Sequence, residues 1–485
     1  MNPSFFCKMG LMLASIIYLE QAGAQQSTVN YDLSNYKLPT LKRHVLEFNF
    51  DIVGNSTSTK SEYNNNDTLE SNQNQYSLGI SPFYSYYLNT EKYQFQYYLT
   101  ADLPELSYNS FKDPIDRAHS LNFYPYVDNS GELREYLKRK FFLEQDFHVS
   151  MNLKKYNWFG ESINDSSVVY TDSHQKTTHY NINLSIPVLA GWGRIEQVED
   201  ARLAVYILDD LNKAGQLNRE INEADIEKLA ELISKVQNER FFDSRLAKIW
   251  QLKQVDSLLE SMSLIDSSNI EYYSLLNDNW DYADGPVRES GFRVSAGFSP
   301  VYYFYNSKYT DERNYYNPDT SITFQTQRKI YNSENGFLLI INYERPLNLY
   351  WQLSLSNNFV ISKTFSREFY NRVDLDTIQK MNRVDVNNYL SGSLKYYPNS
   401  RTTMSLYLTE SFYYWKKKEN DVENTNELGL TSGIGINIDY YISPRVRLDI
   451  YSRIEHYYTK SVEENELLTK EFDFVFGTSL VYKLL

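Results

Sequence analysis

Large apolar side chains stand at every second position near the end of the chain, and small or polar ones stand between them. The positions of this face are Phe472, Phe474, Phe476, Thr478, Leu480, Tyr482 and Leu484, of which Thr478 alone is not a large apolar residue. A period of two places the two sets on opposite faces of a β-strand. One apolar and one polar face is typical of a strand with lipid on one side and water on the other.

The same alternation recurs along most of the chain and predicts an all-β transmembrane barrel of about 14 antiparallel strands, with roughly 12 to 16 as the range. Strands are expected at residues 46–52, 76–88, 93–99, 121–127, 141–153, 180–188, 292–304, 337–343, 351–361, 390–396, 404–412, 428–442, 446–458 and 472–484. An even strand number is what single-chain bacterial barrels require.

The connections between these strands alternate in length and give the barrel a direction. Short turns are expected near residues 89–91, 346–348, 398–400 and 443–444. Long polar loops are expected near residues 55–75, 156–176, 307–326, 364–385, 416–426 and 459–470. Because outer-membrane barrels have short periplasmic turns and longer extracellular loops, both chain termini are predicted to be periplasmic.

One segment breaks the pattern, because from about Ile195 to Ile265 the apolar period changes from two to roughly 3.6. We interpret this segment as three amphipathic helices that form a periplasmic insertion. Gly215 suits the end of the first helix and Asn222 the start of the second, and residues 272–280 fit one more short helix. A plug or brace at the barrel mouth, a docking site for a periplasmic partner and a moving gate are all roles that the pattern allows.

The other end of the chain has the features of a secretory signal peptide. Lys8 precedes the apolar run Met9–Leu19, and the small residues 22–24 resemble a cleavage site. The expected organisation is a signal peptide at 1–24, a periplasmic leader at 25–41, a first barrel half at 42–190, the helical periplasmic insertion at 191–285 and a second barrel half at 286–485. Cys7 is the only cysteine and would leave with the signal peptide, so the mature chain is expected to use no thiol chemistry.

Composition changes this picture in two ways. The 44 tyrosines and 26 phenylalanines suit the aromatic girdles of a membrane barrel. The formal net charge of -14, without clustered Lys and Arg, argues against a nucleic-acid partner.

The signal peptide, the aromatic alternating strands and the final strand at 472–485 resemble those of bacterial outer-membrane β-barrel proteins. The segments Gly191–Glu196, Asp200–Arg202 and Phe242–Arg245 resemble those of uncharacterised barrels that carry a periplasmic helical insertion. The resemblance implies the outer membrane of a Gram-negative bacterium, with termini and insertion in the periplasm. It implies outer-membrane lipid and the barrel assembly machinery as partners, with a periplasmic protein as a further candidate, and it transfers no activity.

Charged side chains recur on the inward faces of the predicted strands. The candidate lumen residues are Glu47, Asp51, Glu144, Asp146, His148, Arg293, Lys395, Arg447, Asp449, Arg453 and Glu455. Candidate plug or docking residues at the insertion are Trp192, Arg194, Arg202, Asp243, Arg245 and Trp250. Charges of both signs inside a barrel indicate either a water-filled channel or a charge-paired network in a narrow lumen.

The sequence gives no support for a catalytic or metal site. Asp146, His148 and Ser150 share one strand face, but alternate residues lie nearly 7 Å apart along a strand, so lumen polarity explains them better than a hydrolytic triad. We expect no enzyme activity, no cofactor and no metal site. The sequence favours a porin-like channel or transporter for small polar solutes with a helical plug or brace. The alternative is a non-conducting structural or assembly component whose insertion docks a periplasmic partner.

Overall fold

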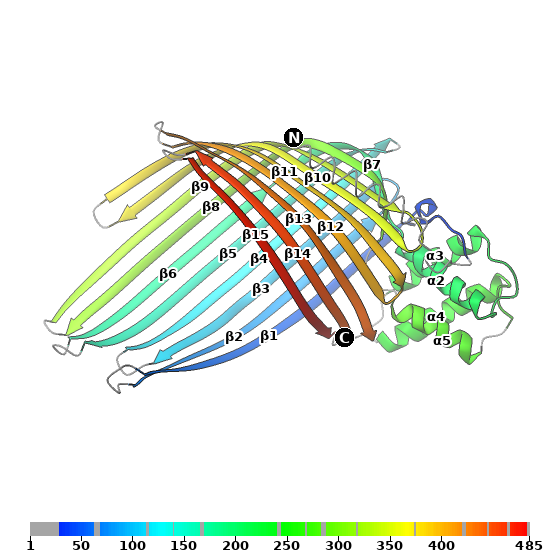
Figure 1. The fold of residues 1–485 in the computed structure, drawn as a ribbon, viewed down its shortest axis with the longest axis horizontal. Coiled ribbons are helices and arrows are strands. Elements are labelled where there is room, and N and C mark those ends of the chain that lie inside the picture. The colour runs from blue at the N-terminus through cyan, green and yellow to red at the C-terminus, as the bar shows by residue number, and fades with distance from the viewer. Residues whose placement is uncertain are drawn as a thin grey trace.

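A computed structural model shows a large antiparallel sheet curled into a barrel, with a group of helices beyond one end of its strands (Figure 1). The structure describes residues 29–62, 68–112, 116–138, 140–164, 169–239, 244–266, 269–282, 288–316, 319–372, 375–419, 423–443, 446–462 and 466–482. The predicted signal peptide lies outside these residues.

The sheet is built from strands that follow the predicted alternation one by one. They are β1 (Leu41–Glu62), β2 (Thr68–Asn89), β3 (Tyr93–Lys112), β4 (Asp116–Lys138), β5 (Phe141–Asn164), β6 (Val169–Ser185), β7 (Val188–Gln197), β8 (Glu289–Tyr316), β9 (Asp319–Pro346), β10 (Trp351–Arg372), β11 (Leu375–Asn399), β12 (Thr402–Glu419), β13 (Glu423–Ser443), β14 (Val446–Val462) and β15 (Glu466–Tyr482). Neighbouring strands pair antiparallel in the order β1 to β6 and then β8 to β15, and β7 pairs with β5 and β8.

Strands β6 and β7 occupy a single position in the sheet, since both pair with β5 on one side and β8 on the other. The break falls at Ile186 and Pro187, and proline has no backbone N–H for a ladder. The ladder closes over this break because Asp146 N donates to the Pro187 oxygen at 3.0 Å and Ile186 N to the Pro300 oxygen at 3.1 Å. The described sheet therefore has fourteen strand positions, which confirms the predicted fold class.

The two faces of the sheet differ in the way that the pattern predicts. Phe48 on β1 stands opposite Pro82 on β2, and Glu47 stands opposite Phe83 on the other face. Phe48 and Phe474 expose 56% and 63% of their surface, as side chains that meet lipid would. Among the described residues, no ladder joins β1 to β15.

The prediction of long loops opposite the helices is wrong for the described residues. Strands β1 and β2 stay paired as far as Glu62 and Thr68, and β8 and β9 as far as Tyr316 and Asp319. These outer segments are polar on both faces because water surrounds them, so alternation gave no sign of a strand there. The ladder continues without an apolar face because each hairpin inherits its register from the membrane part below.

Four helices form the insertion rather than the three that were counted from the apolar period. They are α2 (Glu199–Lys213), α3 (Glu223–Gln237), α4 (Ser244–Ser261) and α5 (Ile270–Asp281), and α5 lies where the sequence suggested a further short helix. Gly215 follows α2 with a φ of +67°, and Asn222 caps α3 in a reciprocal box with Asp225. No described helix is long and apolar enough to span a membrane.

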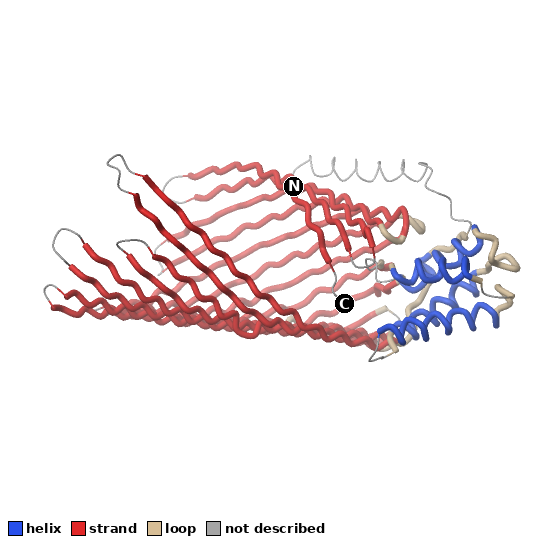
Figure 2. The backbone as a smooth tube through the Cα atoms, turned by 90° about the horizontal axis from the view of Figure 1, so that it is seen from below, coloured by secondary structure: helices blue, strands red, loops and turns tan. Residues whose placement is uncertain are grey.

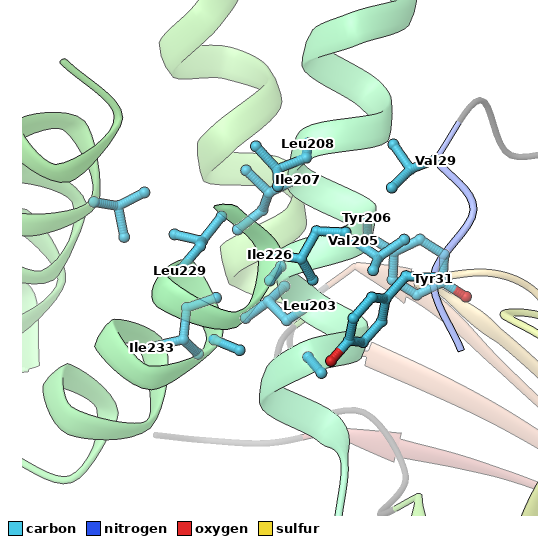
Figure 3. Packing of buried hydrophobic residues seen from close by; sticks show 14 of the residues in the cluster. Val29, Tyr31, Leu203, Val205, Tyr206, Ile207, Leu208, Ile226, Leu229 and Ile233 are labelled. Carbon is cyan, nitrogen blue, oxygen red and sulfur yellow. The ribbon is translucent and has the colours of Figure 1, made fainter. Parts of the chain in front are cut away.

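The helices lie beyond the ends of the strands and share one hydrophobic core with the leader (Figures 2 and 3). Val29, Tyr31 and Leu33 from the leader pack with α2 and α3, and Leu33 begins a short 3-10 helix, η1 (Leu33–Asn35). Leu349 and Tyr350, from the turn between β9 and β10, belong to the same core. We call α2 to α5 the helical unit, and this shared core fixes it to the barrel rim.

Candidate functional site

The inward faces of several strands carry charged side chains next to the rim that carries the helical unit. Here inward side chains surround a hollow of about 170 Å³. Its lining residues are Tyr87, Gln94, Gln96, Glu132, Arg134, Ile195, Gln197, Glu289, Arg293, Asn342 and Glu344. Strands β2, β3, β4, β7, β8 and β9 all contribute, and most of the side chains are polar or charged, so we call this region the charged constriction.

Arg134 is the centre of the largest ion-pair network in the constriction. Its Nε donates to Glu144 Oε2 at 3.1 Å and its Nη2 to Glu132 Oε2 at 2.5 Å. Arg134 and Glu144 expose only 3% and 2% of their surface. Buried charges persist only where they are paired and hydrogen-bonded, and this geometry meets both conditions.

A second arginine, Arg194, anchors β7 to the turn between β2 and β3. Its guanidinium donates to Asn89 Oδ1 and to the Thr90 oxygen, both at 2.8 Å. Arg194 also pairs with Glu196 at 2.5 Å and lies 4.6 Å above the Tyr136 ring. These charge-assisted bonds tie β7 to the turn between β2 and β3 at the rim of the constriction.

Arg288 is fully buried where the chain returns from the helical unit to β8. Its guanidinium donates to the backbone oxygens of Leu349 at 2.6 Å and of Asn348 and Trp351 at 2.9 Å. Burial, with Arg202 as a smaller cause, lowers the pKa of Arg288 to about 10. The residue remains a cation at neutral pH, and it ties the return segment to the turn between β9 and β10.

Helix α2 lies at the mouth of the barrel above this constriction. Most of its side chains are buried, including Ile207, Leu208 and Leu211 at 0% exposure. Tyr87 from β2 and Trp351 from β10, which lie well apart around the sheet, pack against the same core. The helical unit therefore covers the mouth and does not fill the lumen.

The structure places the predicted lumen residues on the inward face wherever their side chains are described, but it does not gather them into one site. Glu144, Asp146, Arg293 and Lys395 lie near the constriction, while Glu47 lies exposed on the interior side of β1. His148 contacts Asp128 at 2.8 Å and not Asp146. Two further pairs, Arg447–Asp449 and Arg453–Glu455, lie on β14 at 2.6 and 3.3 Å, and the Asp51 side chain is outside the described set.

The predicted plug or docking residues are separated by the fold. Trp192 faces outward and contacts Phe292, Arg194 is part of the rim, and Arg202 is buried under Tyr397. Trp250 packs partly buried against the core of the helical unit. Asp243 and the Arg245 side chain lie outside the described part of the chain. Among the described members of this set, Trp192 and Arg194 therefore belong to the barrel wall, whereas Arg202 and Trp250 belong to the helical unit.

Sequence reasoning missed Arg134, Arg288 and Glu344. The first lies in the charged stretch 132–140, where Pro125 made the strand register difficult to assign. Glu344 accepts hydrogen bonds from Gln352 Nε2 at 2.9 Å and Ser354 Oγ at 2.6 Å, and its alternation with Asn342 could have marked it. Among the described residues, no cluster of three or more His, Cys, Asp or Glu could hold a metal ion.

Comparisons with known proteins give little beyond this geometry. No family model and no curated protein matches the chain. The translocator domain of the autotransporter NalP from Neisseria meningitidis aligns over 99% of this chain and 98% of its own, with 6% identity and a TM-score of 0.25. The transport unit of the autotransporter AIDA-I from Escherichia coli aligns over 82% and 91%, with 8% identity and a TM-score of 0.20. Alignments with such low TM-scores and identities do not assign this chain to the autotransporters.

The class follows from the arrangement itself. An outward apolar face, an inward polar face and fourteen strand positions define a transmembrane β-barrel of the outer-membrane type. Its distinguishing feature is a helical unit that covers one mouth above a charged constriction.

Proposed function

We propose that this protein is an outer-membrane channel or transporter for small polar solutes, whose periplasmic mouth is closed by the helical unit in the conformation described here. The observation that carries this proposal is the charged constriction, where acidic and basic side chains line the interior. Rings of charged side chains are how barrels select polar solutes. The proposal places the termini and the helical unit in the periplasm. It is supported by the strands, which end in short turns such as that at residues 90–92 on this rim, whereas on the other rim the hairpins β1–β2 and β8–β9 extend as long polar segments.

Opening of the mouth requires movement of the helical unit relative to the rim. Asp278 on α5 forms an ion pair with Arg401 in the turn between β11 and β12, and Arg401 lies 4.6 Å above the Tyr282 ring. This contact lies at the surface, where an ion pair contributes little stability. It is therefore a suitable place to fix the helical unit without disturbing its core.

The test uses Asp278→Cys and Arg401→Cys together, joined by a thiol linker that a reductant cleaves. Planar-bilayer recordings should show ion current from the unlinked protein, loss of openings after linking, and recovery after reduction. Each single variant treated with the same linker is the matched control. A third form that lacks residues 199–287 should pass steady current. No current from any of these forms would contradict a channel.

A second candidate function is a non-conducting component that binds a periplasmic protein. Leu246 and Ile249, which lie about one helical turn apart on α4, expose 53% and 47% of their surface, and Ile270 on α5 exposes 88%. Exposed apolar side chains that lie close together are typical of contact surfaces. Cross-linking in cells should then capture a second protein with the normal chain and lose it with Ile270→Asp. Recovery of the lone chain from both would count against this role.

A further inference from the structure

The outward face of the sheet carries a group of cations beyond the apolar part of strands β9 to β12, on the side away from the helical unit. On β10 the outward residues from Trp351 to Ile361 are mostly apolar, and Lys363 and Arg367 follow on the same face. Their outward position is marked by exposed Phe365 between them. The apolar part is 11 residues long, which matches the length of a strand that crosses a bilayer.

These cations lie beside one another across the ladders. Arg367 stands directly opposite Lys380 on β11, and Lys363 stands opposite Val384, whose other neighbour is Lys416 on β12. Like charges that stand directly opposite on one face of a sheet destabilise it. Lys329 on β9 adds a further cation to this group, one diagonal step from Arg367. We call these five residues the outer basic group.

Inward cations at the same height are neutralised by the protein itself. Arg328 pairs with Glu368 at 2.5 Å, Arg383 with Asp385 at 2.9 Å and Arg313 with Asp311 at 2.9 Å. In the outer basic group, Lys329, Lys363, Arg367 and Lys416 make no ion pair with a described residue. A chain of net charge -14 has enough carboxylates to neutralise them, so the missing counter-charge points to anions outside the protein.

An apolar hollow lies beside the outer basic group. It has a volume of about 1180 Å³, and its lining includes Phe304, Tyr331, Phe365 and Phe369 from the outward faces of β8, β9 and β10. Arg367 and Lys329 also line it. Aromatic walls with cations at the edge suit an amphiphile that has hydrocarbon chains and an anionic headgroup.

We propose that the outer basic group and this hollow bind the phosphorylated glycolipid of the outer leaflet, with its phosphates on the cations and an acyl chain in the hollow. Two pairs of these cations, Arg367 with Lys329 and Lys363 with Lys416, are offset by about 13 Å along β10 and suit a headgroup with two phosphates. Charge-assisted hydrogen bonds from lysine and arginine to phosphate are strong at a membrane surface, where water is partly excluded. The proposal rests on the orientation given under Proposed function, which places these residues at the extracellular leaflet.

The test measures binding of bisphosphorylated lipid A to the full-length protein in a non-ionic detergent, with native mass spectrometry for stoichiometry and a titration for affinity. The double variant Arg367→Gln with Lys329→Gln should bind at least about tenfold more weakly, since each lost charged bond has an effect of that order. Lys417→Gln is the matched control, because Lys417 neighbours Lys416 but faces the interior, and it should bind as the normal chain does. Monophosphorylated lipid A should bind more weakly than the bisphosphorylated form.

Two further measurements separate the contribution of the acyl chain from that of the phosphates, and test the orientation of the barrel. Phe369→Ala should weaken lipid A binding but leave competition by inorganic phosphate unchanged, whereas equal loss of both would refute a site for the acyl chain. Undiminished lipid A affinity in the double variant, with normal barrel migration on unheated gels, would overturn the proposal. Orientation is tested separately by labelling Thr377→Cys on intact cells with an impermeant maleimide. Absence of label with intact binding would contradict only the proposed orientation.

Discussion

Replacement of Asp200 by asparagine should stabilise the helical unit at neutral pH and remove part of its pH dependence. Asp200 lies in the first turn of α2 with 5% of its surface exposed. Burial raises its pKa to about 6, against smaller opposing effects of the Ser234 hydroxyl and the Arg43 guanidinium. The folded protein thus holds this proton more tightly than the unfolded chain, whose aspartate has a pKa near 4.

The sign and size of the effect follow from this difference. Stability from the protonated carboxyl is fully present below about pH 4 and is lost as the pH rises through about 6, because the unfolded chain releases the proton first. A difference of about 2 pH units corresponds to about 3 kcal/mol, or roughly a hundredfold change in the opening equilibrium. Asparagine resembles the protonated form at every pH. The variant should therefore exceed the normal chain in stability by an amount that grows between about pH 4 and 7.

Hydrogen exchange of α2 and α3 amides, followed by mass spectrometry and corrected for the intrinsic rate at each pH, measures this opening directly. Protection in α2 should fall with rising pH in the normal chain relative to Asp200→Asn. Glu223→Gln, which changes an exposed acid in the first turn of α3, is the control and should follow the normal chain. Parallel pH curves for Asp200→Asn and the normal chain would refute the reasoning.

Three further outcomes are expected. Arg288→Met should lower the opening free energy of the helical unit, measured by the same hydrogen exchange, by about 3 kcal/mol, since three buried carbonyl oxygens lose their donor. Arg288→Lys should keep only part of the exchange protection that the normal chain shows. Leu208→Ala should cost the unit about 2–5 kcal/mol, measured by the same exchange, whereas exposed Leu246→Ala should change it by less than about 0.5 kcal/mol. Gly193→Ala should reduce the fraction that migrates as a folded barrel on unheated gels, because φ is +107° and a Cβ would lie 2.0 Å from the Phe292 oxygen; normal migration would contradict this.

The membrane part of the fold could be predicted from the sequence because lipid imposes a strict period of two. Phe472 and Phe474 show this alternation in the final strand, and the membrane parts of the other strands show the same alternation. The outer halves of β1 and β8 could not be predicted in this way, since water on both faces removes the period. Their strand conformation depends on the register of the neighbouring chain, which is a tertiary effect.

In the candidate site, likewise, local features could be predicted from the sequence and tertiary contacts could not. Glu144 was predicted to face inward because alternation within one strand is a local property. The partner of Arg134 could not be predicted, because it depends on which residues stand opposite across the ladder. Arg288 was missed because its acceptors are backbone oxygens 60 or more residues later in the chain. Every residue has a carbonyl group, so residue types do not indicate which carbonyls will accept these bonds.

The shared core of leader and helices has a consequence for the order of assembly. Val29 and Leu33 precede the first strand, α2 follows the seventh, and Leu349 comes after the ninth, yet all belong to one cluster. Contacts so distant along the chain form late, after the intervening strands have brought their ends together. The helical unit can therefore reach its full stability only when the early and late strands stand around a common mouth. Its protection from exchange would then report that the wall beneath it has been completed.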